Sequence, residues 1–132
     1  MSVVTIYAGI LGFWLVILSM RVIALRRGGG ASLGDGGNEQ LQRRIRAQGN
    51  LTEYAPLGLI LIFALESAQT SEVILHALGA TLVVARLLHG WALSFTPNNS
   101  FGRFWGTLLT FIMIGVASIL CLVAFAGISI SI

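Results

Sequence analysis

The chain has 132 residues, of which 56% are hydrophobic and only 10% charged, and its mean hydropathy is +0.89. A soluble domain usually carries about 25% charged residues, so we expect this chain to fold with a lipid bilayer as part of its solvent. The pI of about 10.0 comes from eight arginines, with no lysine. These arginines flank or enter apolar stretches, which argues against a nucleic-acid-binding face.

The first apolar segment extends from about Val3 to Leu25 and is interrupted only by Arg21. A helix of this length measures about 35 Å and can cross a bilayer. No basic region precedes it, so we do not expect a signal peptide. Residues 28–37 include six glycines and predict a flexible loop. The alternative, a phosphate-binding loop, would end in Gly-Lys-Ser or Gly-Lys-Thr, which this segment lacks.

The second predicted helix extends from Asn38, a favourable N-cap residue, to about Ala68. Its first third is polar and basic, whereas residues 54–65 are uncharged. A helix of such length measures about 45 Å, so its basic end should protrude from the hydrocarbon. Pro56 removes one backbone donor and leaves the carbonyl of Thr52 without its usual partner, which predicts a kink.

Two further apolar helices complete the predicted fold. Residues 66–72 predict a polar turn, and a third span extends from about Val73 to Phe95. Residues 97–100 break that span, and a fourth follows Arg103 and continues to the C-terminus without a charge. We therefore predict a single all-α domain, residues 1–132, that forms an integral membrane bundle of four transmembrane helices.

The arginines also predict the orientation of the chain in the membrane. Arg103 stands in the third loop, and six arginines bracket the first: Arg21, Arg26, Arg27, Arg43, Arg44 and Arg46. The second loop has only acidic residues, and both termini lack basic ones. The positive-inside rule then places the first and third loops in the cytosol and both termini outside it, in a bacterial inner membrane or its equivalent.

The second helix carries a polar face at membrane depth. Arg43, Arg46, Asn50 and Glu53 fall within an arc of about 80°. An ionisable group at such depth costs about 2.5–3.5 kcal/mol by insertion scales. Glu53 alone could pair with Arg46 or Arg86 and hold helices together, but that pairing leaves a surplus of cations. Buried guanidiniums in excess imply an anionic ligand, whose ammonium group could bind Glu53.

The third helix adds Arg86 and His89, three residues apart and toward the same end. His89 is interpreted either as an interface histidine bonded to a carbonyl or as a member of a proton relay with Glu53. His76 lies near the opposite side of the bilayer and is expected to be structural. Two histidines so far apart, without cysteine or aspartate at ligand spacing, predict no metal site. Arg103 could be a snorkelling arginine that sets the topology.

The run Arg46-Ala47-Gln48-x-Asn50-x-x-Glu53-Tyr54-x-Pro56 resembles the signature of the MAPEG family, the membrane-associated proteins in eicosanoid and glutathione metabolism. The resemblance covers essentially the whole chain: four spans, a basic first loop, Ala85-Arg86-Leu87 on the third helix and an arginine at the head of the fourth. It is nearest to the microsomal glutathione transferases and their small bacterial inner-membrane relatives. It implies a homotrimer with a glutathione site between neighbouring subunits, near the cytosolic face.

Roles for individual residues follow from this resemblance. Arg46 and Asn50 would bind the tripeptide, Glu53 its ammonium group, and Tyr54 its backbone or a carboxylate. Further residues expected to contact or support glutathione are Arg26 or Arg27, Gln48, Arg86 and His89. Arg103 would be the catalytic residue that stabilises the thiolate. A free thiol has a pKa near 8.5, and its anion is the nucleophile.

One departure from the family pattern narrows the predicted function. Eicosanoid-forming members carry tyrosines about three and seven residues beyond the shared helix-three arginine, where this chain has His89 and Leu93. We therefore predict a glutathione transferase that conjugates hydrophobic electrophiles, with glutathione as co-substrate and no metal; peroxidase activity could accompany it. The alternative is a non-catalytic scaffold or lipid-binding protein of the same architecture. A small multidrug transporter would need a carboxylate in the first helix, which this chain lacks.

Overall fold

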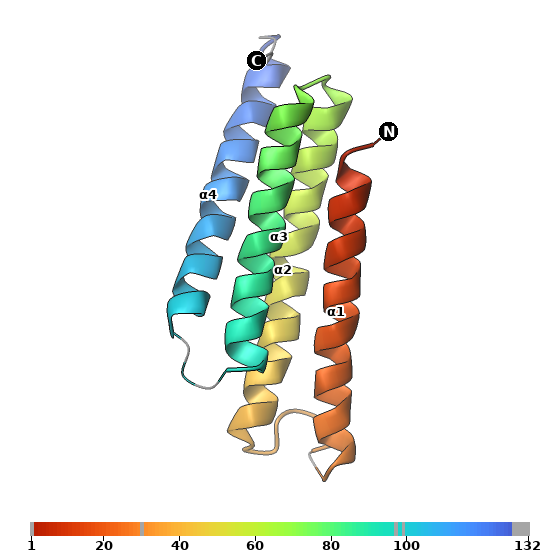
Figure 1. Ribbon diagram of the computed structural model, residues 1–132, viewed down its shortest axis with the longest axis vertical. Coiled ribbons are helices and arrows are strands. Elements are labelled where there is room, and N and C mark those ends of the chain that lie inside the picture. The colour runs from red at the N-terminus through yellow and green to blue at the C-terminus, as the bar shows by residue number, and fades with distance from the viewer. Residues whose placement is uncertain (1, 30, 97, 99, 128–132) are drawn as a thin grey trace.

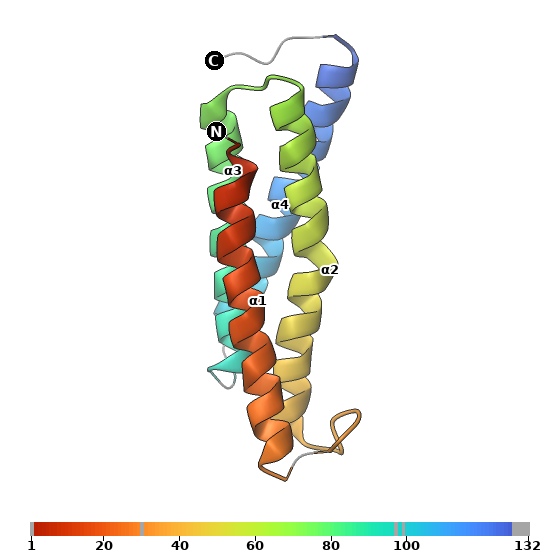
Figure 2. The same cartoon turned by 90° about the vertical axis from the view of Figure 1, so that its right-hand side faces the viewer.

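The computed structural model describes residues 2–29, 31–96, 98 and 100–127, and this part of the chain forms four helices. They are α1 (Val4–Arg27), α2 (Glu39–Ser67), α3 (Glu72–Ser94) and α4 (Ser100–Phe125). The helices run up and down along a common axis (Figures 1 and 2). The end that holds the α1–α2 loop, the end of α3 and the start of α4 is called the basic end below.

The helix boundaries agree with the sequence prediction, with one correction. The side chain of Asn38 accepts a hydrogen bond from the Leu41 amide at 3.0 Å, as expected of an N-cap. The α2 helix continues without a break through Pro56. The fourth helix begins at Ser100, so Arg103 lies inside its first turn and does not precede it. Pro97 and Asn99 of the predicted break, and the last residues of the predicted fourth span, lie outside the described residues.

The helices pack as a central pair with one helix on each side. The α2 and α3 helices contact each other, and both contact α1 and α4, but the described residues of α1 and α4 do not contact one another. The core between them is apolar apart from a few groups; its fully buried large side chains are Leu18, Leu41, Ile62, Leu65, Leu75, Leu82, Met113 and Thr110. Because α1 and α4 are on the outside, each has a broad face free of contact with its own chain.

The backbones of α3 and α4 approach closely at Gly106. A Cβ atom at Gly106 would lie 2.7 Å from the carbonyl oxygen of Ala85 and 2.7 Å from the Cβ atom of His89. Gly102, one turn earlier, is buried as well. Small residues four apart on one face allow transmembrane helices to approach closely. This glycine pair therefore brings α4 against the part of α3 that carries Arg86 and His89.

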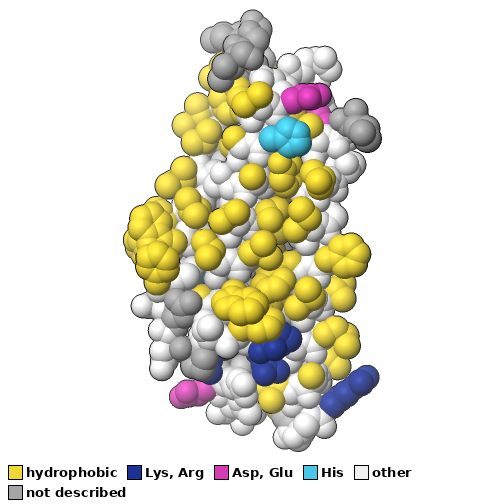
Figure 3. Space-filling model, in the orientation of Figure 1, with side chains coloured by type: hydrophobic (Ala, Val, Ile, Leu, Met, Phe, Trp, Pro, Cys, Tyr) yellow, Lys and Arg dark blue, Asp and Glu magenta, His cyan; other side chains and the backbone are white. Residues whose placement is uncertain are grey.

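The surface of the bundle is suited to lipid. Each helix exposes large apolar side chains, among them Phe13, Ile60, Val73 and Leu122 (Figure 3 shows one face). By length and composition α1, α3 and α4 can each cross a membrane. The α2 helix does not meet that criterion, because its first third is polar, although it packs beside the other three (Figure 2). The predicted integral membrane fold is thus confirmed, with the polar residues concentrated in α2.

Candidate functional site

The candidate site is centred on Arg86, a charged residue of α3 that is only 2% exposed. Its Nη1 donates to Oδ1 of Asn50 at 2.6 Å, and its Nη2 donates to the carbonyl of Gly106 at 2.8 Å. The Tyr54 ring centroid lies 5.6 Å from the guanidinium carbon, within cation–π range. Within the described chain its Nε atom has no hydrogen-bond partner. The charge of Arg86 is therefore solvated by neutral groups, with no carboxylate in direct contact.

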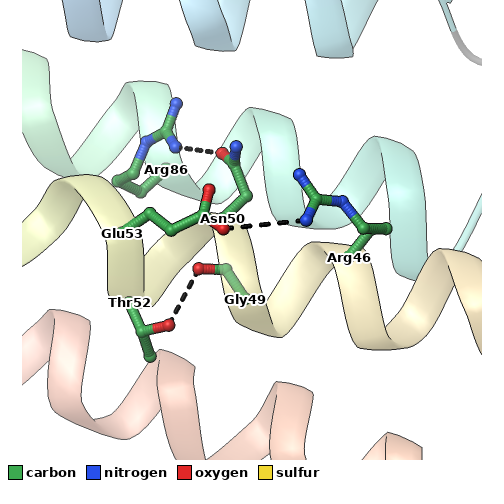
Figure 4. A network of polar contacts seen from close by, with 6 residues as sticks. All are labelled: Arg46, Gly49, Asn50, Thr52, Glu53 and Arg86. Carbon is green, nitrogen blue, oxygen red and sulfur yellow. Dashed lines mark hydrogen bonds and ion pairs between the residues drawn. The ribbon is translucent and has the colours of Figure 1, made fainter. Parts of the chain in front are cut away.

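Arg46 and Glu53 lie on the same face of α2 as Asn50. Nη1 of Arg46 and Oε1 of Glu53 are 3.6 Å apart, and the two side chains are 61% and 50% exposed. Figure 4 shows Arg86 reaching Asn50 from α3, while Arg46 and Glu53 approach each other beside it; Thr52 points away, toward α1. An ion pair this exposed contributes about 0–1 kcal/mol in water. Both side chains thus remain available to a ligand or to a second chain.

His89 joins α4 to the site. It lies three residues after Arg86, is 7% exposed, and packs against the backbone of Gly106. The guanidiniums of Arg86, Arg103 and Arg46 all lie close enough to act on it electrostatically. Arg103, in the first turn of α4, is exposed. Guanidiniums from three helices therefore act on one buried imidazole.

The structure thus brings together most of the residues that the sequence selects. Three guanidiniums, from α2, α3 and α4, act electrostatically on His89, whereas the described side chains show one ion-paired carboxylate beside them, Glu53, which pairs with Arg46. Such a surplus attracts an anion, since charge-assisted hydrogen bonds to guanidinium are strong and directional. The side chain of Asn50 can also bind an anion. Because its Oδ1 accepts from Arg86, its amide nitrogen is left to donate.

Other selected residues lie on a different side of the chain. Nε2 of Gln48 donates to Oγ of Ser19 at 2.9 Å, so this side chain faces α1. Nη1 of Arg26 donates to the carbonyl of Ala31 at 2.7 Å, and Arg27 is exposed in the last turn of α1. Arg43, which the helical arc groups with Arg46, lines a separate hollow between α1, α2 and α3.

Two residues that position the site were missed by sequence reasoning. Gly106 offers its carbonyl to Arg86 and also to Oγ1 of Thr110, at 2.7 Å. Trp14 of α1 donates from Nε1 to the Arg86 carbonyl at 3.3 Å. The Gly102-x-x-x-Gly106 spacing could have indicated the close α3–α4 contact. Nothing in the sequence pattern singles out Trp14.

Comparison with known proteins agrees with this architecture. A family model for the MAPEG family matches residues 4–123. The chain is 33% identical over 84 residues to the inner membrane protein YecN of Escherichia coli (strain K12). YecN of Escherichia coli O6:H1 (strain CFT073) matches to the same extent. The aligned region covers 64% of this chain and 64% of each relative's length.

Proposed function

Since this chain belongs to the MAPEG family, we propose that it is a membrane-bound glutathione transferase acting on hydrophobic electrophiles. The proposal is supported by a surplus of cations: Arg46, Arg86 and Arg103 all act electrostatically on His89, and the carboxylate of Glu53 is paired with Arg46 alone. Glutathione has two carboxylates, one ammonium group and one thiol. Its carboxylates would offset the guanidiniums, and its ammonium group would meet Glu53.

The residues of the cluster divide into binding and chemical roles. Arg46 and the free amide of Asn50 would hold the tripeptide, with Tyr54 beside them; Arg86, bonded to Asn50, is a positioning residue. Arg103 would stabilise the thiolate after the thiol proton passes to water. The sulfur then donates an electron pair to the electrophilic carbon, a carbon–sulfur bond forms, and the leaving group departs with its bonding electrons.

A homotrimer is part of the proposal, because the site is open in a single chain. Arg46 and Glu53 are half-exposed or more, and at the membrane depth expected from the sequence their contact with lipid tails would be unfavourable. A second copy that covers this face would remove both groups from lipid. It could also contribute Arg26 and Arg27 from its α1 helix and Gln48 from the side of its α2 helix that faces α1.

We further propose that the basic end faces the cytosol, with both termini on the other side. The electrophile would then enter from the bilayer along the apolar outer faces of α1 and α4. Those faces expose large side chains such as Phe13 and Phe111, and the two helices do not contact each other within the described chain. A hydrophobic second substrate could thus reach the site without passing through water.

Calorimetric titration with glutathione and conjugation of a chloro-nitroaromatic, both in detergent, test the proposal. We expect binding at or below millimolar concentration and turnover that Arg103→Ala reduces far more than it reduces glutathione affinity. Phe104→Leu, a neutral change of an exposed residue in the same turn, is the matched control. An absence of glutathione binding would overturn the proposal, whereas binding without turnover would favour the scaffold or lipid-binding alternative.

A further inference from the structure

A second basic cluster lies between α1, α2 and α3, separate from the proposed glutathione site. Arg21 donates from Nε to Oγ of Ser94 at 2.8 Å and from Nη2 to the Ser94 carbonyl at 2.7 Å. Its guanidinium carbon lies 3.6 Å from the centroid of the Phe95 ring. Arg43 lines the same small hollow, of about 40 Å³, which is completed by Gln40, Leu93, Ser94, Phe95 and Thr96. Arg21 is thus held in place at the mouth of a polar hollow.

The positive charge of this cluster is not compensated within the described chain. Arg44 donates from Nη1 to the carbonyl of Arg21 at 2.7 Å, and its guanidinium acts electrostatically on that of Arg21. The ion pair found among the described residues joins Arg46 to Glu53 and includes none of these three arginines. Arg21, Arg43 and Arg44 therefore create a local positive potential that favours an anion.

An apolar groove begins directly beside this hollow. Trp14 of α1 and four residues of α3, Val84, Leu87, Leu88 and Trp91, line an open groove of about 430 Å³. Phe95 connects the two features, since its ring stacks on Trp91 at 4.4 Å and on Trp14 at 6.0 Å between centroids. Figure 3 shows basic side chains below a band of hydrophobic ones over α1 and α3.

The order of these features follows the order of groups in a phospholipid. Trp14 and Arg21 are seven residues apart on α1, or about 10 Å along the helix axis, with the charge nearer the helix end. We propose that the α1–α3 groove binds one anionic phospholipid of the leaflet at the basic end. Its phosphate lies against Arg21 and Arg43, and an acyl chain lies along Trp14, Leu88 and Trp91.

The alternative to a specific lipid site is that arginine and tryptophan mark the membrane interface and contact any lipid. Three features are not accounted for by that explanation. The guanidinium of Arg21 is held by Ser94 and Phe95. Arg43 lines the same hollow, Arg44 bonds to the Arg21 carbonyl, and the groove is open. Basic pockets between transmembrane helices are known to select anionic headgroups. The inference does not depend on glutathione binding, because the two clusters share no residue.

Quenching of tryptophan fluorescence by brominated lipids tests the proposal. Trp105→Phe removes the one tryptophan outside the groove and leaves Trp14 and Trp91 as reporters. In phosphatidylcholine bilayers, a small fraction of brominated phosphatidylglycerol should quench several-fold more than the same fraction of brominated phosphatidylcholine. Arg43→Gln should abolish the difference. Arg27→Gln, which removes an equal charge from the exposed last turn of α1, should preserve it.

A folding control for Arg43→Gln and competition by a soluble phosphate complete the experiment. The side chain of Arg43 takes part in no hydrogen bond of the described chain, so Arg43→Gln should fold, and its melting temperature in detergent checks this. Equal quenching by the two lipids would show non-selective contact and overturn the proposal, as would an unchanged preference in folded Arg43→Gln. Reversal of the quenching by millimolar glycerol phosphate would assign the hollow to a soluble anion and also overturn it. Persistence of the quenching would identify the lipid as the source.

Discussion

Arg86 donates a hydrogen bond of 2.6 Å to Oδ1 of Asn50 and so joins α3 to the polar face of α2. The same residue reaches α4 through the carbonyl of Gly106, and its own carbonyl accepts from Trp14 of α1. All four helices therefore meet at one residue. This arrangement ties the packing of the bundle to the geometry of the candidate site, because Asn50 belongs to both.

Substitution of Asn50 should separate these two roles. In Asn50→Leu, Nη1 of the buried Arg86 loses its partner, and we expect a loss of about 1–3 kcal/mol of stability together with weaker glutathione binding. In Asn50→Asp, the new carboxylate can still accept from Arg86, so the fold should keep its stability. The added negative charge would, however, offset the cationic surplus and weaken glutathione binding.

Thermal unfolding in detergent and calorimetric titration with glutathione provide the two measurements. The informative comparison is Asn50→Asp with wild type, since the two side chains have nearly the same size. Glutathione affinity equal to wild type in a stable Asn50→Asp protein would contradict the view that surplus positive charge binds the tripeptide.

Gly106 should tolerate a methyl group poorly. An alanine there would place its Cβ atom 2.7 Å from the carbonyl oxygen of Ala85, which belongs to the α3 backbone and cannot rotate away. We expect Gly106→Ala to destabilise the bundle by about 1–3 kcal/mol through overpacking. Gly115→Ala on the same helix is the matched control, because nothing lies within 4 Å of its new Cβ atom.

For Gly115→Ala, helix propensity alone should act, and it favours alanine by about 1 kcal/mol. The two variants should therefore shift the melting temperature in opposite directions. Equal shifts would mean that the α3–α4 contact at Gly106 is looser than the structure indicates.

The four helices were predictable because apolar length, N-cap chemistry and glycine content are local properties. Asn38 begins α2, and the glycine-rich segment before it is irregular where the structure describes it. The partners of the polar side chains were not predictable, since they depend on how each helix is rotated against its neighbours. A helical arc groups Arg43 with Arg46, yet Arg43 faces the hollow beside Arg21.

The candidate site was likewise predictable only in part. The spacing from Arg46 to Glu53 placed both groups on one face of α2, and their ion pair agrees with this. The identity of the groups that solvate Arg86 came from the tertiary structure, because a backbone carbonyl such as that of Gly106 has no sequence signal of its own.

Glu66 fixes the start of α1 at the end opposite the basic end, and its contribution should depend on pH. It lies beyond the apolar stretch of α2 and accepts from the amides of Val3 and Val4 and from Oγ of Ser2. Partial burial acts to raise the pKa of this carboxyl, but the hydrogen bonds outweigh it and hold the pKa below its usual value of 4.5. Because the pKa is lowered in the folded protein, the charged carboxylate stabilises the fold above pH 4.5. This stabilisation is lost as the pH falls through the lowered pKa.

Glu66→Gln should therefore melt at a lower temperature than wild type at neutral pH, and the difference should shrink in acid. Glu72→Gln, which neutralises an exposed acid at the same end, should show a smaller difference between neutral and acidic pH. Melting curves recorded in detergent across this pH range provide the test. A constant gap between Glu66→Gln and wild type would show that the carboxylate charge is not what stabilises α1.

Tyr7 and His76 form a polar link between α1 and α3 near the same end. The hydroxyl of Tyr7 lies 2.8 Å from Nδ1 of His76, within hydrogen-bond distance, and donates to the His76 carbonyl at 3.1 Å. Tyr7→Phe keeps the ring packed against Gly79 and removes both bonds, so it should cost about 0.5–1.5 kcal/mol of stability per bond lost.

Because His76→Ala removes one of the same bonds, the double variant should be less destabilised than the sum of the single variants. A double-mutant cycle of melting data measures this coupling. Strict additivity would mean that the two side chains act independently and that His76 has some other role at this end of the bundle.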